Sequence, residues 1–209
     1  MRDYSKKTKK RLTGGQAAFL LFLFGIPAIL LAFFAWQGIR YGLRFFEKYN
    51  RYDSMIEAAG RRNGVDPALL KAVIWRESRF DRNAVGTKGE VGLMQIMVQF
   101  AAKDWADAHK RPAPTKGALS DPELNIEIGS WYLGRALRRW ADYREAAALA
   151  LCEYNAGPTR AEAWKPPDKN GTVIDRIDIS STVSYVTVIL TKQKEYAREF
   201  RDKASRGLF

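Results

Sequence analysis

The feature that most constrains this chain is an uninterrupted apolar segment near the N-terminus. From Ala17 to Trp36 the sequence reads AAFLLFLFGIPAILLAFFAW, twenty residues without a charged side chain. A helix of that length spans the hydrocarbon core of a bilayer, roughly 30 Å thick. Gly25 and Pro27 are tolerated in membrane helices, and Trp36 suits the interface. We expect a transmembrane anchor over residues 17–36; a buried core helix is the less favoured structural alternative.

A cleavable signal peptide is the main competing interpretation of this segment. The apolar core of a signal peptide usually runs for about 7 to 15 residues and ends at small residues. Here the apolar run is longer, and Phe33 stands where a small residue would precede a cut after Ala35. The sequence therefore favours an uncleaved anchor.

The charges around the segment predict its orientation. The first eleven residues carry six basic side chains against one acid, Asp3, and so hold a net +5 of the formal +12. Positive charge favours the cytoplasmic side of a membrane. Four basic residues after the segment oppose this orientation but are less dense: Arg40, Arg44, Lys48 and Arg51. We predict a single-pass protein of the bacterial inner membrane, with residues 1–16 as a cytoplasmic basic tail and everything after residue 36 on the periplasmic side.

The remainder reads as a stem followed by an all-α domain. Residues 37–52 suggest a short amphipathic stem, and residues 53–209 a compact multi-helix domain. Asp66 and Pro67 form a helix start, with Asp66 as the cap and Pro67 at the first helical position. The periodicity predicts helices over 52–63, 67–78, 92–108, 121–140, 143–154 and 180–201. Only residues 171–179 suggest extended structure.

The composition excludes several classes of function. The single cysteine, Cys152, rules out an intramolecular disulfide framework, and the single histidine, His109, rules out a multi-histidine metal site. We expect no metal or cofactor. Nucleic acid is a disfavoured partner, because the basic residues are spread among all predicted helices and the domain faces away from the cytoplasm. The charge outside the tail instead suits anionic cell-wall polymers.

One predicted helix carries an acid within its apolar stripe. In ALLKAVIWRESRFD, Leu70, Val73 and Ile74 follow helical spacing, and Glu77 takes the next position of the same face. Glu77 could simply pair with a nearby arginine or reach solvent. A carboxyl among Val and Ile would instead be desolvated, which raises its pKa and keeps it protonated, as a general acid requires.

Three ordered motifs resemble a known family: Glu77-Ser78, Gly92-Leu93-Met94-Gln95-Ile96 and Tyr154-Asn155-Ala156-Gly157-Pro158. They lie within or at the ends of longer similar stretches. ESRFDRNAVGTKGEVGLMQI, LSDPELNIEIGSWYLGRAL and ALALCEYNAGPTR are similar to the catalytic domain of the soluble-type lytic transglycosylases, the goose-lysozyme-like branch of the lysozyme superfamily. The similarity extends from about residue 53 to residue 196. It implies a lysozyme-like fold and peptidoglycan glycan strands as the substrate.

The resemblance also implies a mechanism. Glu77 would protonate the oxygen between N-acetylmuramic acid and N-acetylglucosamine, then accept the proton of the muramic C6 hydroxyl as a 1,6-anhydro ring closes. Two alternatives stay open. One is a muramidase that adds water on the same fold. The other is a weakly active peptidoglycan-binding scaffold of an envelope-spanning machine, which would have envelope assembly partners.

The substrate-binding residues that the resemblance implies are Ser78, Met94, Gln95, Tyr154, Asn155 and Tyr185. Ser78 would contact glycan or the catalytic carboxyl, Gln95 would bond the sugar, and Met94 would add apolar contact. Tyr154 and Asn155 would hold the acetamido group and orient the reactive hydroxyl, and the phenol of Tyr185 would approach Glu77. Core packing is the competing role for Met94, and we favour that role for Met97.

The chain departs from the family pattern before Tyr185. Where the family usually carries a Glu-Thr-Arg-like step, this sequence reads Ser181-Thr182-Val183. The acid and the cation are absent and the threonine is kept, so this step supplies no second carboxylate. Glu153 is the nearest substitute in sequence, but we expect it to face solvent.

Overall fold

The computed structural model describes residues 13–206 of the 209-residue chain. The chain divides into two compact units, Met1–Tyr49 and Asn50–Phe209, which we describe separately. Most of the predicted cytoplasmic tail, residues 1–12, lies outside the described residues.

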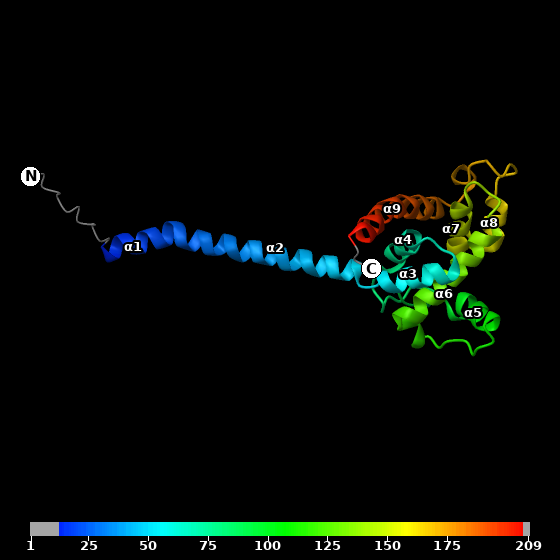
Figure 1. The fold of residues 1–209 in the computed structure, drawn as a ribbon, viewed down its shortest axis with the longest axis horizontal. Coiled ribbons are helices and arrows are strands. Elements are labelled where there is room, and N and C mark those ends of the chain that lie inside the picture. Colours follow the sequence, from blue (N-terminus) through cyan, green and yellow to red (C-terminus); the bar gives the residue numbers. More distant parts are fainter. Residues whose placement is uncertain (1–12, 207–209) are drawn as a thin grey trace, which may run out of the picture. The chain divides into compact units, whose positions relative to one another are not determined.

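The N-terminal unit is a continuous helical run (Figure 1). It comprises α1 (Gly14–Leu20), a π-helical turn (Leu21–Gly25) and α2 (Ile26–Asn50). Pro27 has no backbone N–H to donate and disturbs the hydrogen bonding of a helix, and a π-turn is one way to absorb such a disturbance. No break separates the predicted anchor from the predicted stem at residues 36 and 37.

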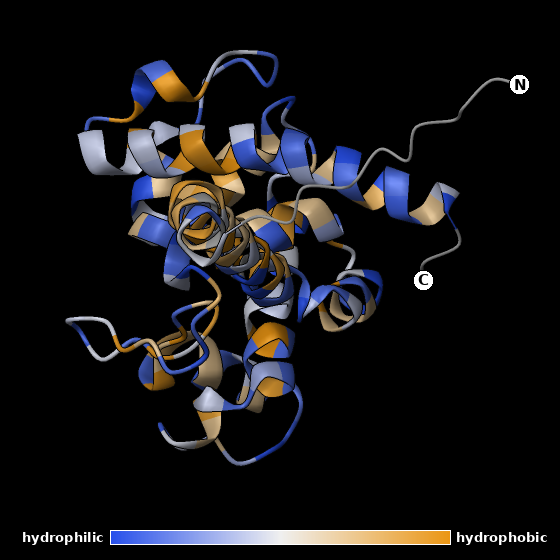
Figure 2. Ribbon diagram, turned by 90° about the vertical axis from the view of Figure 1, so that its left-hand side faces the viewer, coloured by the Kyte–Doolittle hydropathy of each residue, from blue (hydrophilic) through white to orange (hydrophobic). Residues whose placement is uncertain are grey.

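The apolar side chains of this helix are exposed. Phe22 and Leu31 are 70% and 71% exposed, and none of the most apolar window is buried by other described residues. Figure 2 shows its N-terminal part as mostly hydrophobic. By length and composition this helix is able to cross a membrane.

The C-terminal unit is built from helices (Figure 1). They are α3 (Asp53–Asn63), α4 (Pro67–Ser78), α5 (Lys103–Ala108), α6 (Pro122–Arg139), α7 (Ala146–Ala156), α8 (Pro158–Trp164) and α9 (Ser180–Ser205). Short π or 3-10 turns occupy Val98–Ala102, Ala118–Ser120 and Ile174–Arg176. The described residues contain isolated β-bridges but no strand, which confirms the predicted all-α class.

Helix α4 forms as the sequence predicts and lies at the centre of the unit. The Asp66 side chain accepts a hydrogen bond from the backbone N–H of Ala68 at 2.9 Å, and Pro67 takes the first helical position. Leu70, Val73 and Ile74 are fully buried. They anchor α4 in a core where its largest packing partner is α9.

The predicted helix over 92–108 is wrong in its first half. Val91 and Ile96 exchange backbone hydrogen bonds of 3.0 and 2.9 Å, which fold the segment between them into a tight loop. The side chain of Asn125 holds this loop, because it accepts from the N–H of Met94 and donates to the carbonyl of Val91. Regular α-helix starts only at Lys103.

Two other predictions are corrected around the last helices. Residues 171–179 form no strand: a 3-10 turn occupies Ile174–Arg176 at their centre, and the Val173 N–H donates to the Glu145 carboxylate at 2.8 Å. Pro158 starts α8, a helix that lies outside all of the ranges predicted from the sequence. Proline at the first helical position is compatible with a helix because its missing N–H would be unpaired there anyway.

Candidate active site

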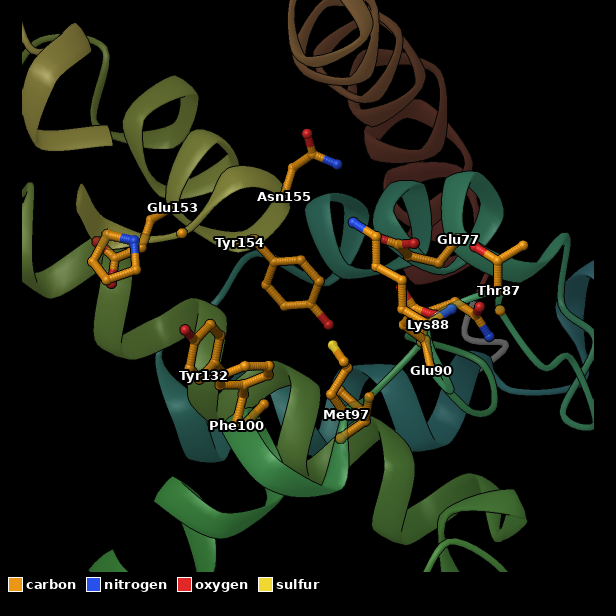
Figure 3. A pocket seen from close by; sticks show the side chains of 16 residues that line it. Glu77, Thr87, Lys88, Glu90, Met97, Phe100, Tyr132, Glu153, Tyr154 and Asn155 are labelled. Carbon is orange, nitrogen blue, oxygen red and sulfur yellow. The ribbon is translucent and has the colours of Figure 1, made fainter. Parts of the chain in front are cut away.

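The predicted acid lies in the wall of a cavity of about 480 Å³ (Figure 3). Side chains reach it from α4, from the loop before α5, from α6 and from the end of α7. Its lining includes Glu77, Gln95, Tyr154 and Asn155. The fold therefore brings residues from three separate motifs of the sequence to one cavity.

Glu77 occupies the last turn of α4 and has an unusual environment. Desolvation by burial raises its pKa from 4.5 to about 7, and the nearby charge of Glu90 acts in the same direction. A hydrogen bond from Tyr185 and the charge of Arg76 act against this rise. The carboxyl is consequently divided between its acid and base forms near neutral pH.

The end of α4 directs the next cation away from Glu77. Arg79 lies in the left-handed region with φ 53°, and Phe80 follows with φ 62°. The guanidinium of Arg79 lies 3.4 Å from the centroid of the Trp75 ring. In the part of the chain that the structure describes, Glu77 has no ion-pair partner. The alternative that Glu77 pairs with a nearby arginine at the surface therefore does not apply.

Two phenols accompany the acid. The hydroxyl of Tyr185, a buried residue of α9, donates to Oε1 of Glu77 at 2.6 Å. The hydroxyl of Tyr154 donates to the carbonyl of Met94 at 2.8 Å. Desolvation, with the charge of Glu77 second, raises the pKa of both phenols well above the usual value. Both therefore stay neutral, and Tyr185 remains a proton donor to the carboxylate.

The loop over residues 92–96 fixes the amide of Gln95. Its Nε2 donates to the carbonyls of Ala84 and Gly92 at 3.2 and 3.0 Å. The loop requires glycine at Gly92, where φ is +81° and a Cβ would lie 2.6 Å from the carbonyl oxygen of Leu119. The position of Gln95 is thus built into the backbone.

Ser78 and Met94 support the site without lining the cavity. The Ser78 hydroxyl lies 2.8 Å from the carbonyl of Leu93 and joins α4 to the loop. The Met94 side chain is fully buried and packs against Gly129 of α6. The contact is so close that a Cβ added at Gly129 would lie 2.9 Å from the Cβ of Met94. The predicted apolar contact between Met94 and the sugar is wrong, because the loop turns this side chain into the core. Met97, which we expected in the core, lines the cavity instead.

Asn155 is held by Thr182, the residue of the Ser181-Thr182-Val183 segment that matches the family pattern. The buried Thr182 donates through its hydroxyl to Oδ1 of Asn155 at 2.9 Å. Ser181, which replaces the expected acid, is exposed. The lost acid therefore leaves the positioning of Asn155 intact.

The cavity lining also contains residues that the sequence did not predict there, among them Glu90, Phe100, Tyr132 and Glu153. Glu153 was expected in solvent but is 3% exposed and accepts a hydrogen bond from Trp140 Nε1 at 2.9 Å. Helix α7 is apolar around most of its circumference, which is typical of a buried helix and was the available signal. Phe100 is 58% exposed on the cavity rim, and nothing in its local sequence marks it.

Neither the cysteine nor the histidine belongs to this site. Cys152 is buried, and desolvation raises the pKa of its thiol to about 12. The His109 ring packs on Trp105 with centroids 4.8 Å apart. No group of three or more acidic, histidine or cysteine side chains able to hold a metal occurs within residues 13–206.

Comparison with known proteins finds relatives under two names. Membrane-bound lytic murein transglycosylase C of Cronobacter sakazakii is 28% identical over 173 residues, 73% of this chain and 48% of that protein. The X polypeptide of Escherichia coli is 29% identical over 120 residues, 57% of this chain and 69% of its own length. The chain therefore spans only about half of the transglycosylase.

Solved structures agree in fold. The 70-kDa soluble lytic transglycosylase of Escherichia coli superposes with a TM-score of 0.63 at 26% identity, over 71% of this chain and 24% of that one. The lytic transglycosylase Slt of Pseudomonas aeruginosa gives a TM-score of 0.64 at 24% identity, over 73% and 25%. The family described as "Transglycosylase SLT domain" matches residues 54–175, more than half of the chain. With its all-α, lysozyme-like C-terminal unit, this chain belongs to the Transglycosylase SLT domain family.

Proposed function

We propose that this protein is a peptidoglycan lytic transglycosylase that cleaves the β-1,4 bond between N-acetylmuramic acid and N-acetylglucosamine. The observation that carries the proposal is Glu77: a half-buried carboxyl in a cavity wall, with its pKa near 7 and a phenol donating to it. Membership of the Transglycosylase SLT domain family and the names of its relatives support the same reaction.

Glu77 serves as acid and then as base. Its proton passes to the glycosidic oxygen as the bond to the anomeric carbon breaks. The resulting carboxylate takes the proton from the muramic C6 hydroxyl, whose oxygen bonds to the anomeric carbon and closes the 1,6-anhydro ring. Glu77 ends protonated and no water is added. A pKa near the working pH suits both steps, and the hydrogen bond from Tyr185 stabilises the carboxylate between them.

The remaining cavity residues provide substrate binding in this proposal. Gln95 and Asn155 offer amide groups to hydroxyl and acetamido groups, and Tyr154 adds a phenol beside Glu77. Phe100 and Tyr132 present aromatic surface for the apolar faces of sugar rings. Ser78 and Met94 act indirectly, because both hold the loop that carries Gln95.

We propose the membrane location on two supports. A relative is named membrane-bound, and one helix of this chain is long and apolar enough to span a bilayer. The proposed arrangement is a cytoplasmic tail (1–16), an inner-membrane anchor (17–36), a stem (37–52) and a periplasmic catalytic domain (53–209). Cysteine-accessibility labelling of intact spheroplasts, at Thr13→Cys and Ser181→Cys in a Cys152→Ala background, tests it: only the second should react with an impermeant maleimide.

Product mass tests the enzymatic proposal. The detergent-solubilised protein is incubated with purified sacculi, and the released muropeptides are weighed by mass spectrometry. Anhydro-muramic products are expected from the wild type. Glu77→Gln should release none while retaining its helical circular dichroism, and Glu123→Gln, an exposed acid on another helix, should behave as the wild type. Products heavier by one water would make the protein a muramidase, and binding to sacculi without release would make it a scaffold.

A further inference from the structure

A second carboxylate, Glu90, reaches the cavity from a tight turn that its own side chain helps to fix. The backbone N–H of Gly86 donates to the carbonyl of Glu90 at 2.8 Å, and that of Gly89 donates to Gly86 at 3.1 Å. Within the turn, the N–H of Lys88 donates to Oε2 of Glu90 at 2.9 Å. The carboxylate therefore has a defined position beside the cavity rather than a mobile one in solvent.

The Glu90 carboxylate and the Gln95 amide meet over Gly86. A Cβ at Gly86 would lie 2.8 Å from Oε1 of Gln95 and closer still to Oε2 of Glu90. Both hydrogen-bond partners of Gln95 Nε2 are carbonyl oxygens, so the nitrogen must face them and Oε1 must face Gly86. Figure 3 shows Glu90 on the same side of the cavity as Glu77. The shared approach to Gly86 places Oε1 of Gln95 next to the Glu90 carboxylate.

The charged and titratable groups that surround the Glu77 carboxyl come from several elements. Arg76 of α4 and the phenol of Tyr185 of α9 favour the carboxylate form. Tyr154 of α7 is uncharged, and its own titration responds to the charge of Glu77. Of the charges that act on Glu77 within the described residues, that of Glu90 favours the protonated form. Two further charged residues line the cavity: Lys88, which is exposed, and Glu153, which is bonded to Trp140.

Resting on the proposed role of Glu77, we propose that Glu90 is a positioning residue whose negative charge keeps the catalytic proton on Glu77. Glu90 acts through Glu77 and takes no proton from the substrate. Its position is set by the turn and by Gly86, where any larger residue would displace the carboxylate. The apolar helix stripe desolvates Glu77, and the turn adds a like charge that reinforces the protonated state.

The consequence has a definite sign. A like charge nearby raises the pKa of a carboxyl, so its removal lowers that of Glu77 and releases the proton at a lower pH. The alkaline limb of kcat/KM, which reports the free enzyme's acid, should therefore move to lower pH. A fall of the Glu77 pKa from about 7 to about 6 would reduce the protonated fraction at pH 7 about five-fold.

Glu90→Gln tests the proposal in the full-length chain in detergent micelles. The glutamine keeps an oxygen to accept from the Lys88 N–H while removing the charge. The titration midpoint of Glu77 is followed by carboxyl ¹³C NMR in protein labelled at glutamate, with the resonance assigned by its loss in Glu77→Gln. In parallel, muropeptide release is measured against pH. Both midpoints should fall in Glu90→Gln and in Glu90→Ala, a second neutral variant, and should return toward the wild type in Glu90→Asp.

Lys88→Gln is the matched control, because it perturbs the same turn but leaves Glu90 charged; its midpoint should not fall. An unchanged Glu77 midpoint in both neutral variants would overturn the proposal. A uniform loss of activity at every pH, with the midpoint fixed, would also overturn it, since Glu90 would then act on the substrate. The NMR titration does not depend on turnover. If the wild type released no product but the midpoint still fell, the proposed function would fail and the role of Glu90 would stand.

Discussion

Glu77 should reduce the stability of the domain above neutral pH. Its folded-state pKa of about 7 exceeds the ordinary 4.5, so the folded state binds its proton more tightly than the unfolded state does. In such a case the free energy of unfolding falls as pH rises through the interval between the two values. Glu77→Gln carries no such penalty, and its amide oxygen can still accept from the Tyr185 hydroxyl. The variant should therefore be more stable than the wild type at pH 8 and equally stable at pH 4.

The size of the effect follows from the shift. A rise from 4.5 to about 7 corresponds to roughly 3 kcal/mol at 1.36 kcal/mol per unit. Glu77 is half-buried at a cavity wall, so solvent reduces this to about 1–2 kcal/mol. For a domain of this size, one kcal/mol moves Tm by about 2–4 °C. Glu77→Gln should consequently raise Tm by about 2–8 °C at pH 8.

Thermal unfolding followed by circular dichroism at 222 nm, at several pH values in one detergent, measures the difference. Glu123→Gln, an exposed acid on α6, is the matched control and should show no pH-dependent gain. A constant Tm difference between wild type and Glu77→Gln from pH 4 to pH 8 would refute the reasoning. It would mean that the Glu77 carboxyl titrates alike in the folded and unfolded chains.

Three more predictions follow from single contacts. Tyr185→Phe removes the hydrogen bond that favours the carboxylate of Glu77, so the alkaline limb of the pH–activity profile should move upward; a downward shift would contradict the assigned donor. Phe100→Ala should raise KM for glycan strands several-fold with little change in kcat, measured by release of soluble muropeptides; an effect on kcat alone would exclude a binding role. Gly92→Ala should destabilise the domain by more than about 2 kcal/mol in urea unfolding, because φ is positive there and the added Cβ meets Asn125 and Leu119; a wild-type midpoint would show that the loop yields.

The sequence was most informative where local rules and burial agree. The Asp66-Pro67 start and the apolar spacing of Leu70, Val73 and Ile74 predicted α4 at its observed bounds. The same spacing singled out Glu77 and the direction of its pKa shift, because an acid within an apolar stripe must be desolvated. The predicted approach of Tyr185 to Glu77 came from the family resemblance and agrees with the observed hydrogen bond.

The sequence misled where tertiary hydrogen bonds override helical periodicity. Residues 92–97 have a helix-like pattern, but Asn125, distant in the chain, holds them as a loop. That loop exchanges the expected positions of Met94 and Met97, because it turns Met94 toward Gly129 and leaves Met97 at the cavity. Glu153 was likewise expected to be exposed but is buried, because other elements enclose α7 on nearly all sides. Trp140 donates the hydrogen bond that a buried carboxylate needs.

The sequence by itself determined the all-α class, the candidate membrane helix and Glu77 as the candidate acid, because each depends on spacing along one helix or on one apolar run. Tertiary structure alone decided that Glu90 and Glu153 line the cavity with Glu77, and that Met97 rather than Met94 does so. It also decided that the hydroxyl of Thr182 holds Asn155. These relations join residues far apart in the chain. They depend on how α4, α7, α9 and the turn at Glu90 pack together, and no periodicity within a single segment records that packing.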